Sequence, residues 1–429
     1  MTGARLRACA LLLPLCAAAA QAEFRVDISQ GVEQGIPIAL VAQSGSERKL
    51  AEVMGADLAR SGFFRVLDPA GTPQAAVSGE DLNWDAWDGN PAEYAVVTVV
   101  QHLASGRLQL DLRLFDLLAG KTVLARRLSA KPQQLRRLAH QAADALHEKV
   151  TGIPGAFDTR IAYVSQTRTS GRVRYHLYVA DVDGHGPVAI LISPRPLLSP
   201  TWSPDGRHLA YVSFETRRPQ VFLQNLQDAS RRALPGSGRT SSAPAFSPDG
   251  RRLALAMTAA DGDMEIFIYA LDTGALSRFT YSPGIDTEPA WEADGQGLVF
   301  TSDRSGKPKL YRQGLRDPSA RMLLIPGNYT TDAVVSTDGR YLAFVQSTDA
   351  GGYGVVLFEP ESQGLFPLSS GTLDEAPSFA PNGFSLIYAS TTEAGEQVLM
   401  LASHNGRIRQ RLRLAHSDVR EPAWSPYRR

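Results

Sequence analysis

Acidic residues recur just ahead of a motif that the chain repeats, and these side chains offer the clearest potential for chemistry. They are Asp286, Glu288, Asp332, Asp374, Glu375, Asp418 and Glu421, with Arg195 and Arg420 as the nearby basic residues. Carboxylates gathered at one opening favour a cationic or hydrogen-bond-donating partner and steer its approach. Two facing carboxylates are also what glycoside hydrolysis needs. A third interpretation, that each acid only solvates its own loop, fits the sequence equally well.

Signatures of catalysis and of metal binding are absent from the sequence. The chain has no G-x-S-x-G elbow, no P-loop, no G-x-G-x-x-G after a strand and no H-E-x-x-H motif. Its eight histidines are scattered, and His140 and His147 have no cysteine or carboxylate at co-ligand spacing. Residues 181–184 and 261–263 resemble parts of calcium loops, but both lack the later glutamate and fit hairpin turns better. The sequence therefore predicts no enzyme activity, no cofactor and no metal site.

The motif that follows the acids occurs six times. Its first copy is SPTWSPDG at residues 199–206, and later copies place an aromatic or apolar residue at Phe246, Trp291, Val335, Phe379 and Trp424. Counted from Trp202, the intervals are 44, 45, 44, 44 and 45 residues. A period of this length, with four short strands in each unit and a Pro-Asp-Gly turn after the first, is typical of a β-propeller.

The last copy of the motif, at residues 421–427, has no blade after it. Residues 161–165 (IAYVS) nearly match residues 209–213 (LAYVS) but lack a first strand of their own. We therefore expect the C-terminal strand to complete the first blade and to close a six-bladed ring over residues 156–429 without exposed edges. Trp202, Trp291 and Trp424 are expected in the core between blades, with ligand stacking as the alternative.

The first 22 residues have the pattern of a secretory signal peptide. Arg5 and Arg7 precede an apolar run, and Ala20-Gln21-Ala22 fits a cleavage site, so the mature chain should start at Glu23. Both cysteines lie in this segment, and Cys16 leaves a lipoprotein anchor open as an alternative. Without the two arginines, the chain has 42 basic and 44 acidic residues, a net charge of −2. This charge does not favour binding to nucleic acid. No later apolar run is long enough to span a membrane.

Residues 23–150 lack the repeat and predict a small α/β domain. Strands are expected at residues 36–42, 63–67, 94–100, 108–115 and 123–129, and helices at 44–60 and 132–150. Residues 151–155 form a short breaker before the propeller. At the start of the domain, Phe24, Val26 and Ile28 alternate with polar residues, which is compatible with an edge strand of the domain or with a strand offered to a partner.

The order of signal peptide, α/β domain and six repeats resembles the TolB family of the Tol-Pal system of Gram-negative bacteria. Three segments carry the resemblance beyond the generic repeat: residues 28–38 (ISQGVEQGIPI), 373–383 (LDEAPSFAPNG) and 422–427 (PAWSPY). The resemblance implies a periplasmic adaptor rather than an enzyme, and a monomer within a heteromeric complex. Its propeller mouth would bind the peptidoglycan-associated outer-membrane lipoprotein Pal, and its N-terminal segment would bind the inner-membrane-anchored TolA. Other envelope proteins stay open as partners.

The resemblance also implies site residues and a cellular role. The TolA-binding segment would be Glu23, Phe24, Arg25, Val26, Asp27 and Ile28, and would extend to about Glu33. The Pal-binding face would contain Ser199, Pro200, Thr240, Thr287, Glu288, Asp332, Asp374 and Glu375. Thr240 stands where the family often has a histidine, so hydrogen bonding there is expected to differ. The protein would support outer-membrane integrity and envelope constriction during cell division.

Overall fold

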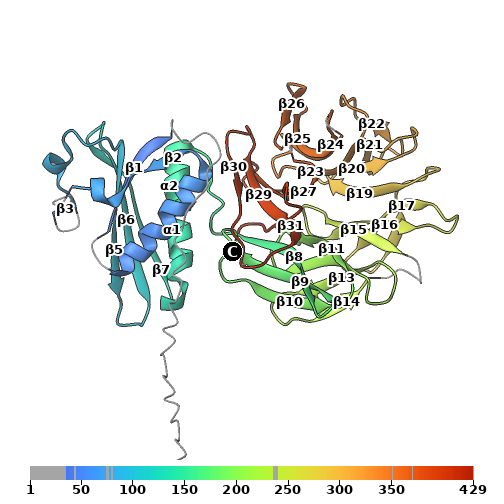
Figure 1. The fold of residues 1–429 in the computed structure, drawn as a ribbon, viewed down its shortest axis with the longest axis horizontal. Coiled ribbons are helices and arrows are strands. Elements are labelled where there is room, and N and C mark those ends of the chain that lie inside the picture. The colour runs from blue at the N-terminus through green and yellow to red at the C-terminus, as the bar shows by residue number, and fades with distance from the viewer. Residues whose placement is uncertain are drawn as a thin grey trace, which may run out of the picture.

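The structure is a computed structural model that describes residues 35–42, 45–73, 77–78, 81–234, 240–349, 351–369 and 371–428. It contains a small N-terminal α/β part and a C-terminal six-bladed β-propeller, so the predicted fold class is confirmed (Figure 1). The expected signal peptide and the expected TolA-binding segment lie outside the described residues. In the described part of the chain, no helix is both long enough and apolar enough to cross a membrane.

The N-terminal part is built on one mixed five-stranded sheet. Its strand order is β2 (Phe64–Val66), β1 (Ile36–Val41), β5 (Tyr94–His102), β6 (Leu108–Asp116) and β7 (Lys121–Ala130). β1 is parallel to β2 and β5, whereas β5, β6 and β7 are antiparallel. Along β6, Leu108, Leu110, Leu112 and Leu114 alternate with more polar residues and are all buried, as expected for a strand with one face on the core.

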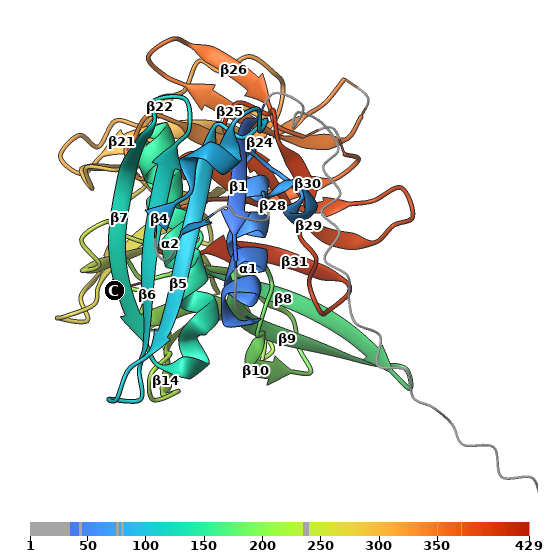
Figure 2. The ribbon, with the colours of Figure 1, turned by 90° about the vertical axis from the view of Figure 1, so that its left-hand side faces the viewer.

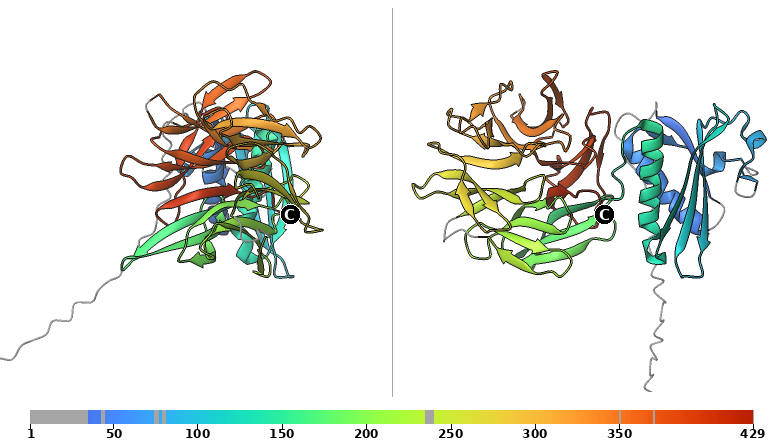
Figure 3. Two further views of the ribbon diagram at one scale, coloured as in Figure 1. Left: turned by 90° about the vertical axis from the view of Figure 1, so that its right-hand side faces the viewer. Right: turned by 180° about the vertical axis from the view of Figure 1, so that it is seen from behind.

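Two helices cover one face of this sheet and lie between it and the propeller (Figures 1 and 3). α1 (Gly45–Ser61) and α2 (Leu135–Thr151) bury Leu50, Met54, Leu138 and Ala142 against the β6 leucines. A smaller core on the opposite face is built around Trp87 and Phe115. Short elements complete this part: η2 (Pro69–Gly71), β3 (Val77–Ser78), β4 (Asp81–Leu82), η3 (Trp84–Trp87) and η4 (Pro132–Gln134).

The propeller consists of six four-stranded antiparallel sheets. Blade 1 contains β31 (Val419–Trp424), β8 (Arg160–Thr169), β9 (Arg172–Asp181) and β10 (Val188–Ser193). Blade 2 contains β11 (Leu197–Trp202), β12 (His208–Ser213), β13 (Gln220–Asn225) and β14 (Arg231–Ala233). Blade 3 contains β15 (Ser241–Phe246), β16 (Arg252–Thr258), β17 (Met264–Ala270) and β18 (Leu276–Arg278).

The remaining three blades follow the same order. Blade 4 contains β19 (Asp286–Trp291), β20 (Gly297–Ser302), β21 (Lys309–Gly314) and β22 (Arg321–Met322). Blade 5 contains β23 (Thr330–Val335), β24 (Leu342–Ser347), β25 (Tyr353–Glu359) and β26 (Gly364–Pro367). Blade 6 contains β27 (Asp374–Phe379), β28 (Ser385–Thr391), β29 (Gln397–Ser403) and β30 (Arg409–Arg411).

The repeated Ser-Pro-Asp-Gly forms the turn between the first two strands of a blade. In blade 2, the Ser203 hydroxyl donates to Asp205 (2.6 Å) and accepts from the His208 amide (2.9 Å), while Gly206 takes a φ of 67°. The Ser203 hydroxyl and the Asp205 carboxylate thus find partners inside the turn, and the positive φ suits glycine. This chemistry explains why the motif returns with the blade period.

The C-terminal strand completes blade 1, as the repeat count predicted. β31 pairs with β8 from Val419–Ser165 to Trp424–Ile161. The Arg160 amide donates to the Ser425 hydroxyl (2.8 Å), the same bond that His208 makes to Ser203 within one hairpin. Trp202 and Trp424 are buried between blades and donate through Nε1 to Ala423 O (3.0 Å) and Thr159 Oγ1 (2.8 Å). The inter-blade placement of these tryptophans is therefore confirmed.

Candidate partner-binding site

The first strands of the six blades surround a central channel with a volume of about 770 Å³. Its charged lining residues are Glu288, Asp332, Glu375 and Glu421, and the described lining includes no lysine, arginine, histidine or cysteine. We call the end of the channel where the first strands begin the mouth. With four acids and no basic residue among its described lining, the channel suits a cationic or hydrogen-bond-donating partner.

A bulge near the start of each first strand shapes the mouth. The six equivalent residues Ser199, Ala243, Glu288, Asp332, Ala376 and Glu421 have φ between 46° and 53°, although none is glycine. The strand register shifts at the same place in every blade. A non-glycine residue in this conformation costs about 1 kcal/mol. The ring of blades thus holds six strained positions around one opening.

Three mouth carboxylates connect neighbouring blades. The Glu421 carboxylate accepts from the Ser199 amide (2.8 Å), that of Glu288 from the Asp332 amide (2.8 Å), and that of Asp332 from the Ala376 amide (3.0 Å). In each case the acceptor and the donor are bulge residues of adjacent blades. These acids therefore satisfy backbone groups that the bulge removes from the strand ladder. The loop-solvation interpretation is wrong for these three acids.

Burial and neighbouring carboxylates raise the pKa values of Asp332 and Glu421. Burial raises the pKa of Asp332 well above its usual range, and the neighbouring Glu288 and Glu421 carboxylates add to the effect. Burial likewise raises the pKa of Glu421 to about 7, although the hydrogen bond from Ser199 opposes the shift. A cation or a strong donor at the mouth would favour the ionised forms of both acids, so binding and ionisation are linked there.

The residues predicted for the Pal-binding face divide into two groups. Ser199, Pro200, Glu288, Asp332 and Glu375 line the channel, as the sequence prediction requires of residues that face a partner there. Thr240, Thr287 and Asp374 do not line it. Thr240 is half-buried and lies within hydrogen-bonding distance of the Thr258 hydroxyl, and Asp374 is buried and accepts from the Gly371 amide (2.8 Å). Thr287 is half-buried in β19, next to Glu288.

The chain matches known proteins along almost its whole length. A family model described as TolB amino-terminal domain matches residues 24–123, and one described as TolB beta propeller domain matches residues 147–428. The Tol-Pal system protein TolB of Xanthomonas euvesicatoria pv. vesicatoria is 42% identical over 427 residues, which cover 98% of this chain and 97% of that protein. The chain belongs to the TolB family.

Other relatives support the assignment of this chain to the TolB family. The Tol-Pal system protein TolB of Xanthomonas oryzae pv. oryzae is 41% identical and covers 97% of this chain and 96% of its own length. The crystal structure of TolB from Acinetobacter baumannii superposes with a TM-score of 0.84 at 32% identity, covering 94% of this chain and all of that one. The resemblance seen in the sequence is confirmed, and the chain is a Tol-Pal system component.

The junction between the two parts of this TolB-family chain contains a buried ionic cluster that the sequence did not predict. His140 of α2 is fully buried, and its Nδ1 lies 2.6 Å from Asp57 Oδ2 of α1. Its Nε2 lies 3.8 Å from Asp183 Oδ2, in the turn between β9 and β10. Arg60 pairs with Asp57, and Arg136 with Asp183. The cluster joins both helices to the propeller.

Charges of opposite sign are balanced within this junction cluster. Burial lowers the pKa of His140, but the Asp57 and Asp183 carboxylates together outweigh that effect and leave the pKa raised. Burial raises the pKa of Asp183, but Arg60, His140 and Arg136 together lower it. Asp57, His140 and Asp183 have metal-ligating atoms within 4.8 Å of one another. Two arginines already neutralise the two carboxylates, so the donor set does not fit a metal.

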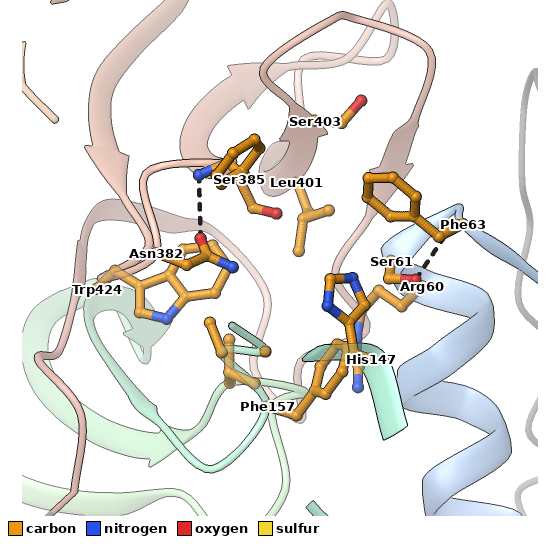
Figure 4. A pocket seen from close by; sticks show the side chains of 14 residues that line it. Arg60, Ser61, Phe63, His147, Phe157, Asn382, Ser385, Leu401, Ser403 and Trp424 are labelled. Atoms are coloured by element: carbon orange, nitrogen blue, oxygen red, sulfur yellow. Dashed lines mark hydrogen bonds between the residues drawn. The ribbon is translucent and has the colours of Figure 1, made fainter. Parts of the chain in front are cut away.

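A small pocket beside this cluster shows how closely the two parts of the TolB fold approach (Figure 4). It has a volume of about 30 Å³, and its lining includes Phe63 and His147 from the α/β part and Leu401 and Trp424 from the propeller. Nearby, a Cβ on Gly62, which has a φ of 72°, would lie 1.2 Å from Ile408 Cδ1. The Asn382 side chain donates to Pro154 O (2.9 Å). The pocket has room for about one water molecule.

The contacts at this junction leave the mouth of the TolB-family propeller free. They involve the turn after β9, the turn after β27 and the turn between β29 and β30. Because strands alternate in direction, these turns lie at the end of the propeller opposite the mouth. The mouth and the junction therefore lie at opposite ends of the propeller.

Proposed function

We propose that this chain is a periplasmic adaptor of the Tol-Pal system that binds the lipoprotein Pal at the propeller mouth and TolA through residues 23–33. The observation that carries the proposal is the acid-lined, strained mouth on the end of the propeller that the α/β part leaves free. Membership of the Tol-Pal family supports the choice of partners, and the signal-peptide pattern supports export to the periplasm. The role is binding rather than catalysis, in support of outer-membrane integrity and constriction during cell division.

The mouth is tested by charge reversal at Glu375. This residue lines the channel, but no described residue donates a hydrogen bond to its carboxylate, so its replacement spares the ring of bulge contacts. In a calorimetric titration of residues 23–429 with the soluble domain of Pal from the same source, Glu375→Arg should weaken binding at least tenfold, about 1.4 kcal/mol. Glu361→Arg, an exposed acid in the turn before β26, should bind as the wild type does.

A calorimetric titration with the soluble domain of TolA tests the second proposed contact. A chain that starts at Gln34 should lose binding to the soluble domain of TolA while its melting temperature stays within a few degrees of the wild type. Wild-type affinity for Pal in the Glu375→Arg variant would show that the mouth is not the Pal site. Undiminished TolA binding by the shortened chain would exclude the N-terminal segment. If Pal binding and TolA binding influence each other, linkage requires the effect to be reciprocal.

A further inference from the structure

The central hairpin of blade 1 is longer than its counterparts in the other blades. β8 and β9 have ten residues each, whereas the second and third strands of blades 2–6 have six or seven. At about 3.3 Å per residue, the extra length extends the hairpin by roughly 10–13 Å. We call residues 166–175 the arm. It projects beyond the rest of the propeller (Figures 2 and 3).

The arm lies on the rim of the mouth. β31 runs away from the mouth, β8 runs back towards it, and the turn between β8 and β9 is therefore at the mouth end. The arm has no neighbouring strand for most of its length, because β31 pairs with β8 only as far as Ser165 and β10 reaches β9 only at Tyr175. Ser170 and Gly171, with φ of 49° and 76°, form its tight turn.

The arm is strongly basic. It contains Arg168, Arg172 and Arg174 and no acidic residue, in a chain with equal numbers of basic and acidic residues. All three arginines are exposed, and no acidic side chain among the described residues forms an ion pair with them. The charge is therefore available to a partner, next to a channel whose own charged residues are all acidic.

The strand register arranges these groups into one polar face. Thr169 lies opposite Arg172, and Thr167 lies opposite Arg174, so two hydroxyls and two guanidinium groups share a face of the ribbon. At its base, His176 Nε2 is 3.1 Å from the Thr167 hydroxyl, and the His176 ring stacks on Tyr178, which stacks on His416. Arginine and threonine donors in this arrangement match carboxylate groups. The stacked rings hold the ribbon at its base.

We propose that the arm is a second contact for the partner bound at the mouth, and that it binds acidic side chains on that partner. This inference rests on the proposed function of the mouth. The mouth would select donors and cations on the partner while the arm selects carboxylates, so the two surfaces together fix the partner's orientation. A membrane surface fits the arm less well, because the tip residues Thr169, Ser170 and Gly171 offer no apolar side chain to a bilayer.

The test is charge reversal of the arm in the mature chain. The R172E/R174E variant is compared with R251E/R316E, which makes the same charge change at two exposed arginines outside the arm and the mouth. Calorimetric titration with the soluble domain of Pal is done at 50 and 200 mM salt. We expect the arm variant to bind at least tenfold more weakly at 50 mM and to lose most of the salt dependence of the wild type, and we expect the control to change affinity less than twofold.

The outcomes separate the two proposals. If R172E/R174E binds as tightly as the wild type while Glu375→Arg does not, the arm is not a contact and the mouth assignment stands. If the wild type itself does not bind Pal, both proposals fail. Vesicles of phosphatidylglycerol and phosphatidylethanolamine serve as the second probe. Arginine-dependent binding to vesicles, with Pal affinity unchanged in the arm variant, would assign the arm to a membrane and overturn the proposed protein contact.

Discussion

At the scale of single residues, the mouth shows one carboxylate performing two tasks. Glu421 caps the backbone of the next blade and also contributes charge to the channel. The first task suits a neutral or an ionised side chain, but the second needs the ionised form, and burial raises its pKa to about 7. The residue therefore changes charge within the range in which proteins commonly work.

The pH dependence of stability tests this assignment. Because the folded-state pKa of Glu421 is raised from 4.5 to about 7, its contribution to stability is full below pH 4.5 and is lost as the pH rises through 7. The loss amounts to about 3 kcal/mol. Glu421→Gln keeps an acceptor for the Ser199 amide but cannot ionise. We therefore expect a smaller fall in its free energy of unfolding between pH 5 and pH 8, measured by urea denaturation.

A control residue makes this comparison specific. Glu361→Gln, at an exposed position, should keep the slope of the wild type. Equal slopes for Glu421→Gln and the wild type would mean that Glu421 is ionised at both pH values.

At the scale of elements, the repeat was predictable because its chemistry is local. The Ser203–Asp205–Gly206 turn closes its hydrogen bonds within six residues, so its sequence signature returns in full in blades 3 and 5 and in modified form in blades 4 and 6. Partners distant in sequence left no such signature. His140 and Asp57 are 83 residues apart, and each looks like an isolated polar residue on an otherwise apolar helix face. The length of the arm was also missed, since its outer residues are polar and lack the apolar alternation of a core strand.

The closing strand gives a prediction at this scale. A chain that ends at Leu414 lacks β31 and leaves the edge of β8 and the Trp424 site between blades unfilled. We expect it to lose the cooperative unfolding transition in differential scanning calorimetry. Arg428→Ala removes an ion pair with Asp181 but keeps β31, so its transition should stay cooperative. A sharp, wild-type transition for the shortened chain would show that blade 1 is stable with three strands.

At the scale of the whole molecule, the junction cluster links the α/β part to the propeller. Asp57, His140 and Arg136 come from the helices and Asp183 from the propeller, and all except Arg136 are buried. Asp144 adds a further tie, because its carboxylate accepts from the Phe157 and Asp158 amides (2.7 and 3.0 Å) and thereby holds the connecting segment on α2. The α/β part is therefore held on the propeller by buried polar contacts as well as by the connecting segment.

Removal of the Asp183 carboxylate tests this link. Asp183→Ala removes the ion-pair partner of Arg136 and one of the two carboxylates beside the buried His140, at a cost of about 3–5 kcal/mol. We expect the single thermal transition of the wild type to separate into two, one for each part of the chain, in a calorimetric scan. Glu361→Ala should leave the single transition unchanged. A single transition at the wild-type temperature for Asp183→Ala would mean that the junction contributes little to coupling.

The bond between Arg160 and Ser425 has a consequence for how the protein matures. It replaces, across 265 residues, a contact that the hairpins of blades 2, 3 and 5 make within five. During synthesis from the N-terminus, all strands of blades 2–6 are therefore made before β31, the strand that closes the ring. Until β31 pairs with it, β8 has a free edge. A chain truncated before β31 retains that free edge. Pairing of β31 with β8 is thus the step that removes this free edge, and it can occur only once the chain is complete to that strand.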